Sequence, residues 1–306
     1  MATEKPSPTV MVVLVVLLLV AAGAAAAFVY EYNKTKSAPS ALTVKVGANI
    51  TVNYIGVFGS GPQEGRVFDT SYYAVATNNL SYPKSLEYTP RGPVTAYTPL
   101  GVHVGPTAPA SGYTIGNFTF NTVVTGFWQG VIGLGGNQTR TIVVPPSLGY
   151  GAMNTSCLRT LPLAYTVPVL SFVPIASFGT LYPGVSETVG TVFVDPNYGW
   201  NDTVFAVNSS SVTVASLATL GEKATPDGLP FVVAALNATT ISLSSLLTPA
   251  SAGLVLGKLP TGGFCTKSEF IVSAVNVAAG TFTENFNPEV QGETLDFVVS
   301  VVDIFP

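Results

Sequence analysis

The sequence predicts a mostly β protein of the α+β class that follows a single N-terminal transmembrane helix. From residue 42 onward, short runs of β-branched and aromatic residues recur between glycines and prolines, as is typical of strands. No long amphipathic helical pattern appears in the 306 residues. Residues 10–30, in contrast, are almost wholly aliphatic or alanine. The chain therefore divides into one apolar helix and a β-rich remainder.

The apolar segment 10–30 predicts a membrane anchor between a short tail, 1–9, and a polar linker, 31–40. About 20 apolar residues are enough for a helix to cross ~30 Å of hydrocarbon. A cleaved signal peptide is the alternative, because the alanine-rich end of the segment offers small-residue cleavage sites. The apolar run is longer than a usual signal-peptide core, which favours the anchor. The few lysines on either side do not settle its orientation.

Asparagines in glycosylation sequons indicate which side of the membrane the remainder faces. N-glycosylation occurs on exported chains, although a composition rich in Ser and Thr also inflates the number of sequons. Together with the anchor, the sequons predict a single-pass glycoprotein of the cell membrane whose C-terminal domains face outside. Nine asparagines stand in the pattern N-x-S/T: Asn33, Asn49, Asn79, Asn117, Asn137, Asn154, Asn201, Asn208 and Asn237.

Charge and metal-binding residues exclude several classes of function. Only 9% of the residues are charged, the net charge is −4 and no basic run occurs, so the sequence predicts no nucleic-acid partner. One histidine and two cysteines cannot form a structural zinc site of the usual kind. The paired carboxylates or Ser/His/Asp sets of hydrolases have no candidate constellation. We therefore expect neither a metal nor a cofactor.

The β-rich remainder begins with strand patterns at 43–46 and 50–55. A proline-rich stretch, 72–116, follows and predicts a long loop insertion, because proline blocks regular structure. Residues 127–134 predict a short helix that its glycines weaken. Strand patterns resume at 139–144 and continue to a strong closing strand, 294–304.

Five segments taken in order resemble the FKBP family of peptidyl-prolyl cis-trans isomerases. They are Val52–Gly56, Gly65–Ser71, Val123–Val131, Ile142–Gly151 and the closing Thr294–Phe297. The resemblance implies an FKBP-like antiparallel half-barrel sheet around a short helix, formed by residues 41–151 and 285–306.

The distance between the last two segments implies an insertion. Gly151 and Thr294 stand far apart here, whereas a short flap joins them in a simple FKBP. The approach to the closing strand, 285–295, and the stretch Asp195–Trp200 resemble long archaeal and SlyD-like members, which carry an insert-in-flap domain. We therefore expect a β-rich inserted domain over residues 152–284.

The resemblance also implies a substrate pocket. Carried over position by position, its polar contacts are Asp69 and Tyr150, and its floor is Phe127, where the family often has tryptophan. The simpler alternative is that the aromatic residues are core and that Asp69 is a turn residue. The remaining implied walls are Tyr54, Phe68, Val123, Val124 and Phe297, with Phe118 and Phe120 as less certain substrate contacts.

Such a pocket suits rotation about an X-Pro bond. Amide resonance sets a barrier of ~20 kcal/mol, and a catalyst needs only to bind the twisted amide better than the planar one. The resemblance implies a folding enzyme that acts on unfolded or proline-containing polypeptides. The alternative is a catalytically weak chaperone or cell-envelope binding module on the same scaffold.

The two cysteines, Cys157 and Cys265, flank the expected insert near its two ends. An oxidising exterior favours a disulfide between them, and free thiols are the alternative. Closing a loop of this length stabilises by ~4 to 5 kcal/mol in the chain-entropy model.

Overall fold

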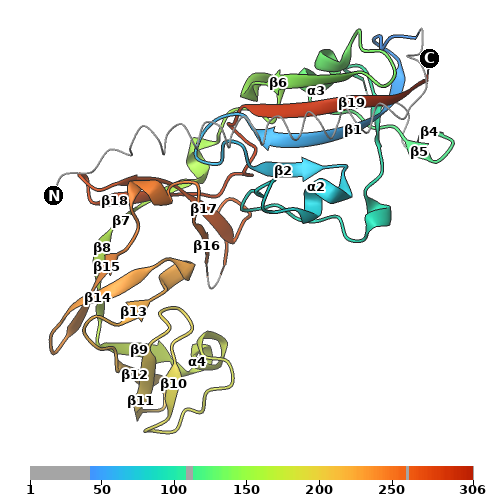
Figure 1. Ribbon diagram of the computed structural model, residues 1–306. Coiled ribbons are helices and arrows are strands. Elements are labelled where there is room, and N and C mark those ends of the chain that lie inside the picture. Colours follow the sequence, from blue (N-terminus) through green and yellow to red (C-terminus); the bar gives the residue numbers. More distant parts are fainter. Residues whose placement is uncertain (1–41, 108–112, 260–261, 306) are drawn as a thin grey trace. The chain divides into compact units, whose positions relative to one another are not determined.

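The computed structural model describes residues 42–107, 113–259 and 262–305. Strands dominate the described residues and helices are few and short, which confirms the mostly β prediction of the α+β class (Figure 1). The predicted tail, anchor and linker at 1–40 lie outside these residues. Among the described helices, none has the length and apolar character that crossing a membrane requires.

The chain forms two compact units. One, called here the sheet unit, comprises the chain up to Ala152 and from Val290 onward, and the other, called the insert unit, comprises Met153–Glu289. The helices and strands of the sheet unit are β1 Asn49–Phe58, β2 Val67–Thr70, α2 Tyr73–Thr77, the 3-10 turn Val94–Ala96, β3 Leu100–His103, β4 Thr114–Ile115, β5 Phe118–Thr119, α3 Thr125–Val131, β6 Thr139–Val144, the 3-10 turn Pro146–Leu148 and β19 Leu295–Phe305.

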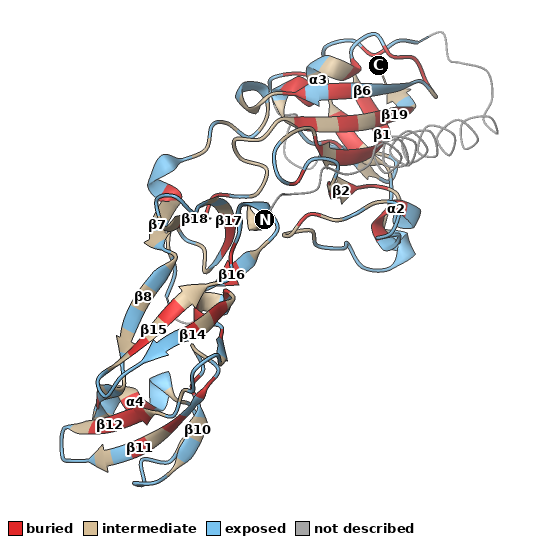
Figure 2. Ribbon diagram, turned by 60° about the vertical axis from the view of Figure 1, so that its left-hand side comes forward, coloured by how far each residue is buried: buried red, intermediate tan, exposed pale blue. Residues whose placement is uncertain are grey.

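An antiparallel sheet in the order β2-β1-β19-β6 forms the centre of the sheet unit, and β3 also pairs with β1. Almost every residue of β1 is buried, as its run of β-branched and aromatic side chains predicts. Phe127 and Val131 of α3 pack into the core formed by β1, β6 and β19 (Figure 2). The short helix therefore covers one face of the sheet.

The proline-rich stretch 72–116 has more regular structure than the sequence predicts. It contains α2, and its strand β3 pairs with β1 from Asn49–His103 to Val52–Leu100. The prolines lie outside these elements, so the backbone between them remains free to pair. The stretch thus contributes a strand to the sheet, in addition to loops at its edge.

The insert unit contains three four-stranded antiparallel sheets in its described residues, which we call the first, second and third modules. Their strand orders are β10-β11-β12-β9, β13-β14-β15-β8 and β16-β17-β18-β7. The elements, in chain order, are the 3-10 turn Thr155–Cys157, β7 Leu158–Pro162, β8 Ala164–Pro168, β9 Leu170–Pro174, α4 Ile175–Leu181, β10 Val192–Val194, β11 Asn201–Val207, β12 Ser211–Ser216, β13 Lys223–Ala224, the 3-10 turn Pro226–Gly228, β14 Phe231–Leu236, β15 Thr240–Ser245, the 3-10 turn Pro249–Ser251, β16 Leu256–Lys258, β17 Glu269–Asn276 and β18 Thr281–Asn285.

The three modules are copies of one design. Strands β7, β8 and β9 follow one another and each ends in proline, and each proline pairs with the first residue of the last strand of its module. The chain then completes the first module, the second and finally the third. The modules are therefore nested, each within the loop of the next.

Equivalent residues repeat in each module. A β-bulge carries the pattern Val-x-Ala at Val204, Val233 and Val272, and an asparagine follows at the hairpin turn. The Oδ1 atoms of Asn208 and Asn237 accept hydrogen bonds from the backbone N–H of Ser210 and Thr239 at 2.8 and 2.9 Å, and Asn276 does the same for Ala279 at 3.0 Å. Asparagine thus precedes a two-residue turn in the first and second modules and a longer turn, 277–280, in the third. The sequence interpretation missed this repeat.

The predicted disulfide between Cys157 and Cys265 is confirmed. It joins the residue before β7 to the loop before β17, and both strands belong to the third, outermost module. The two cysteines are 108 positions apart in the sequence, and the residues between them include the first and second modules entirely. Because loop closure costs more entropy as the loop lengthens, the bond acts on the module whose strands are furthest apart in sequence.

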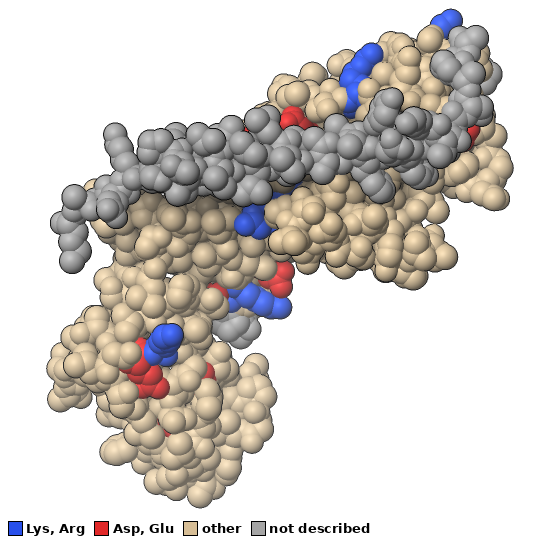
Figure 3. Space-filling model, in the orientation of Figure 1, with Lys and Arg blue, Asp and Glu red and all other residues tan. Residues whose placement is uncertain are grey.

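Charged side chains are few on the surface in view, where small groups of them lie among uncharged residues (Figure 3). One ion pair of the third module, Lys258 with Glu269, is well exposed, and such a pair contributes little to stability. Apolar burial and strand pairing, rather than surface charge, therefore hold the modules together.

Replacing both cysteines by serine tests how much the disulfide stabilises the insert unit. The variant Cys157→Ser with Cys265→Ser is expected to lower the free energy of unfolding of the insert unit by ~4 to 5 kcal/mol. Urea unfolding measured by circular dichroism, with wild-type protein in reductant as the matched control, checks this. An unchanged midpoint would show that the pairing of β7 with β18 needs no cross-link.

Candidate functional site

A cavity of about 330 Å³ opens in the sheet unit. Its wall comes from strands β1, β2, β3 and β19, from α3 and the residues before it, and from the loop after β6. The structure brings together around it all eight residues expected at the main pocket, and adds Leu100 and Thr122. The lining residues are Tyr54, Phe68, Asp69, Leu100, Thr122, Val123, Val124, Phe127, Tyr150 and Phe297.

Aromatic rings in edge-to-face contact form much of the cavity wall. The ring centroids of Phe127 and Phe297 lie 5.0 Å apart, and those of Phe68 and Phe297 lie 5.5 Å apart, with nearly perpendicular planes. Tyr54 meets Phe127 in the same way at 6.2 Å. Such contacts are favourable beyond the area that they bury, and they restrict the orientation of each ring. The result is an apolar cup with fixed walls.

Two glycines place Phe127 in the cup. A Cβ atom at Gly130 would lie 2.3 Å from Ile142 Cγ2, and one at Gly126 would lie 2.7 Å from Val144 Cγ1. Both contacts are too short for any other residue without movement of β6 or the helix. The glycines that weaken α3 as a helix are therefore the residues that let it lie against the sheet.

A charged network occupies the polar edge of the cavity. The Asp69 carboxylate accepts hydrogen bonds from the Tyr54 hydroxyl and from Arg91, whose Nη2 lies 2.8 and 2.9 Å from its two oxygens. The backbone N–H of Thr70 donates to Asp69 Oδ1 at 2.8 Å. The Arg91 guanidinium also lies 5.6 Å from the centre of the Tyr54 ring. The carboxylate is thus held from three sides.

Burial keeps the tyrosine hydroxyls of this site protonated. Burial, with the neighbouring Asp69 carboxylate, raises the pKa of Tyr54 and of Tyr150 above the ordinary value. Burial disfavours the charged form of Arg91, but Tyr54 and Asp69 outweigh it and raise the pKa of Arg91. At neutral pH the Tyr150 hydroxyl can therefore donate a hydrogen bond, for example to a carbonyl oxygen, while the Tyr54 hydroxyl donates to Asp69.

The two less certain candidates lie elsewhere in the sheet unit. Phe118 is in β5, which pairs with β4, and neither it nor Phe120 lines the cavity. Phe120 is buried against Tyr113 and Phe305, at centroid distances of 6.2 and 5.6 Å. Its ring therefore packs beside the end of the closing strand.

Sequence reasoning missed Arg91, Leu100 and Thr122. Thr122 stands directly before Val123, so extending that segment by one residue would have included it. Arg91 and Leu100 belong to the proline-rich stretch, where no sequence pattern marks which side chains turn toward β1 and β2. Only the pairing of β3 with β1 and the reach of a long arginine bring them to the site.

A comparison with known proteins finds a similar archaeal enzyme. The chain is 27% identical over 119 residues to a short-type peptidyl-prolyl cis-trans isomerase of Methanocaldococcus jannaschii. The match covers 39% of this chain and 58% of that relative, so it spans little more than half of the relative's length. No protein-family model matches the chain.

Adding a methyl group at Gly130 tests the close approach of α3. Gly130→Ala is expected to destabilise the sheet unit by about 1–3 kcal/mol, because the new Cβ overlaps Ile142. Gly179→Ala is the matched control, since a Cβ there meets no atom within 4 Å and alanine favours helix α4. Thermal unfolding of both variants decides, and equal effects would contradict the packing argument.

Proposed function

We propose that this chain is a peptidyl-prolyl cis-trans isomerase that catalyses rotation about X-Pro bonds. The observation that carries the proposal is the aromatic cup with Asp69 and Tyr150 at its polar edge. The similarity to the archaeal isomerase supports it independently. An uncatalysed X-Pro bond relaxes over tens of seconds, which is slow enough to limit folding.

The cup accounts for how such a reaction would proceed without covalent chemistry. The proline ring enters between Phe68, Phe127 and Phe297, and the preceding carbonyl remains at the polar edge. As the amide twists, its carbonyl loses conjugation with nitrogen. The apolar walls accommodate the twisted amide and exclude the water that would otherwise stabilise the planar amide. A protonated Tyr150 hydroxyl or the Val124 amide donates to the bound peptide. Catalysis then comes from binding the twisted amide better than the planar one.

We further propose that the substrates are exported or membrane proteins that fold outside the cell. The predicted anchor at 10–30 and the sequons support this location. The confirmed disulfide agrees with an oxidising exterior, where such bonds persist. The anchored chain would then meet proline-containing segments as they leave the membrane.

A second candidate function is a polypeptide-binding module with a weak catalytic pocket. The first module favours it, because its strands expose large apolar side chains to solvent. Phe172 and Phe205 are 73% and 59% exposed, and Val192 and Val194 of β10 are also exposed. Exposed apolar groups on strands are typical of surfaces that contact other chains.

Turnover of a short X-Pro peptide, coupled to a protease that cleaves only the trans form, distinguishes the two functions. Asp69→Ala and Phe68→Ala are each expected to lower kcat/KM about tenfold or more, the effect of losing ~1.4 kcal/mol of transition-state stabilisation. Glu64→Gln, which removes an exposed carboxylate of the same unit, is the matched control. No turnover by the wild-type chain would favour the binding module.

Arg91 is expected to position Asp69 without contacting the substrate. Arg91→Met removes the paired hydrogen bonds to Asp69, and their partial exposure limits the effect to about 1 kcal/mol, or roughly fivefold in kcat/KM. Arg91→Lys keeps the charge but not the planar Nη2 group that reaches both oxygens of Asp69 and the Tyr54 hydroxyl, so it should recover only part of the activity. If Arg91→Met left kcat/KM unchanged, Asp69 would be positioned by Tyr54 and Thr70 alone.

A further inference from the structure

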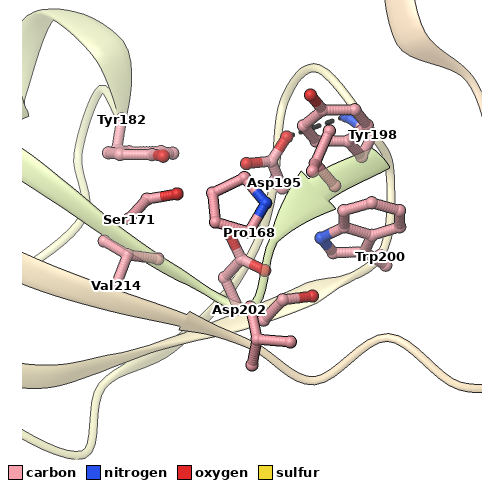
Figure 4. A pocket seen from close by; sticks show the side chains of 11 residues that line it. Pro168, Ser171, Tyr182, Asp195, Tyr198, Trp200, Asp202 and Val214 are labelled. Atoms are coloured by element: carbon pink, nitrogen blue, oxygen red, sulfur yellow. Dashed lines mark hydrogen bonds between the residues drawn. The ribbon is translucent and has the colours of Figure 1, made fainter. Parts of the chain in front are cut away.

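A second cavity lies in the insert unit, where β8 ends and the first module begins (Figure 4). Its volume is about 110 Å³, several times the space that one water molecule needs. The strands β8, β9, β11 and β12 and the loop between β10 and β11 surround it. We call it the acidic recess, and its lining residues are Val167, Pro168, Val169, Ser171, Tyr182, Asp195, Tyr198, Trp200, Asp202, Val214 and Ser216.

Two buried polar atoms of the recess have no hydrogen-bond partner. Asp202 is 5% exposed and Trp200 is 2% exposed, yet neither Asp202 Oδ1 nor Trp200 Nε1 meets the geometry of a hydrogen bond. Burial and Asp195 disfavour the charged form of the Asp202 carboxylate, whereas the Trp200 and Ser216 side chains face it and favour that form. Figure 4 shows both side chains turned into the cavity. Leaving such atoms unpaired is energetically unfavourable, so a buried carboxylate oxygen and a buried indole N–H in one cavity point to a ligand.

The rest of the recess is rigid and negatively charged. Asp195 is held by the backbone N–H groups of Asn197 and Tyr198, each 2.8 Å from its Oδ1. Tyr198 stacks on Trp200 with ring centroids 4.4 Å apart and planes only 6° from parallel. None of the described residues that line the recess is a lysine or an arginine. Carboxylates beside aromatic rings are the chemical complement of an organic cation.

The junction between the second and third modules shows what partner such carboxylates take. There Asp227 and the buried Glu284 lie on either side of Arg159, whose Nε is 2.5 Å from Glu284 Oε2. The Nη2 atom of Arg159 lies 3.8 Å from Asp227. In the first module, Ser171, which lines the acidic recess, takes the place that Arg159 has in the third. At the acidic recess, therefore, the chain places no arginine at that position.

We propose that the acidic recess binds the cationic end of a lysine or arginine side chain presented by another polypeptide. The cation pairs with Asp202 and Asp195, and a carbonyl oxygen of the same polypeptide accepts from Trp200 Nε1. A metal ion fits less well, because Ca²⁺ takes six to eight oxygen ligands, and no three His, Cys, Asp or Glu side chains gather suitably anywhere in the described residues. The acidic recess is separate from the aromatic cup of the sheet unit, and the proposal does not depend on isomerase activity.

The recess should bind a cation more tightly above neutral pH than below it. Burial, together with the Asp195 carboxylate, raises the pKa of Asp202 to about 7. The other titratable groups that face it are Asp195, Tyr182 and Tyr198, and burial raises the pKa of both tyrosines, so they stay neutral. A cation prefers the ionised form of Asp202, and protonation below pH 7 competes with binding.

Tryptophan fluorescence provides the test, because the chain has only two tryptophans, Trp128 and Trp200. In a full-length Trp128→Phe background, emission reports on the recess alone. Blocked pentapeptides with a central lysine, arginine or glutamine are titrated at pH 8 and pH 6. We expect saturable binding of the lysine or arginine peptide, about tenfold weaker at pH 6, and about tenfold weaker binding of the glutamine peptide.

Variants complete the test. Asp202→Asn should abolish the preference for the cationic peptide, whereas Glu269→Gln, an exposed carboxylate of the same unit, should leave it unchanged. Equal binding of all three peptides, or no saturable change up to millimolar concentration, would overturn the proposal. If Asp202→Asn does not fold, the comparison of peptides and of pH in the parent protein still decides. X-Pro turnover measured in parallel keeps this result separate from the proposed isomerase function.

Discussion

The pairing of the first strand with the last is the constraint on which the rest of the structure depends. Strand β19 lies between β1 and β6 and pairs with β1 from Asn49–Phe305 to Phe58–Leu295 with one β-bulge, so the chain that leaves after β6 has to return beside β6. Its two ends meet where the Gly292 N–H donates to the Gly151 carbonyl at 2.9 Å. A domain whose ends are this close can be inserted without disturbing the sheet. The returning strand also brings Phe297 to the cavity, so the proposed site is complete only when the chain has closed.

In the insert unit, too, a strand late in the sequence closes each sheet by pairing with an early strand. Each module closes when its last strand pairs with β9, β8 or β7, and the sequence between the paired strands lengthens from the first module to the third. Because closing a longer loop costs more entropy, the outermost module has the greatest need of a cross-link, and the disulfide is located there. Nesting also creates junctions between successive modules. At one of them acidic groups pair with Arg159, and at the other they line the acidic recess.

Both cavities combine aromatic rings with a carboxylate, and their surroundings give them different chemistry. In the sheet unit, Asp69 is paired with Arg91 and Tyr54, which leaves the cup mainly apolar and suited to a proline ring. In the insert unit, Asp202 is buried without a basic partner, so its carboxylate remains available to a cation. Under the two proposals above, the sites take a proline and a basic side chain on separate units of one chain.

The sequence by itself determined the strand-rich class, because side-chain type, alternation and glycine or proline punctuation act locally in short segments. The eight residues that surround the larger cavity were expected from the resemblance to a known family, and the disulfide was expected from the positions of the two cysteines, with free thiols as the alternative. The threefold repeat is present in the evenly spaced prolines of β7 to β9, but the Val-x-Ala bulges that complete it recur at uneven distances along the chain. Only the tertiary structure decided that Phe120 packs beside β19, that Arg91 reaches Asp69 and that Asp202 is buried unpaired. Those outcomes depend on contacts between segments distant in sequence, which no local pattern encodes.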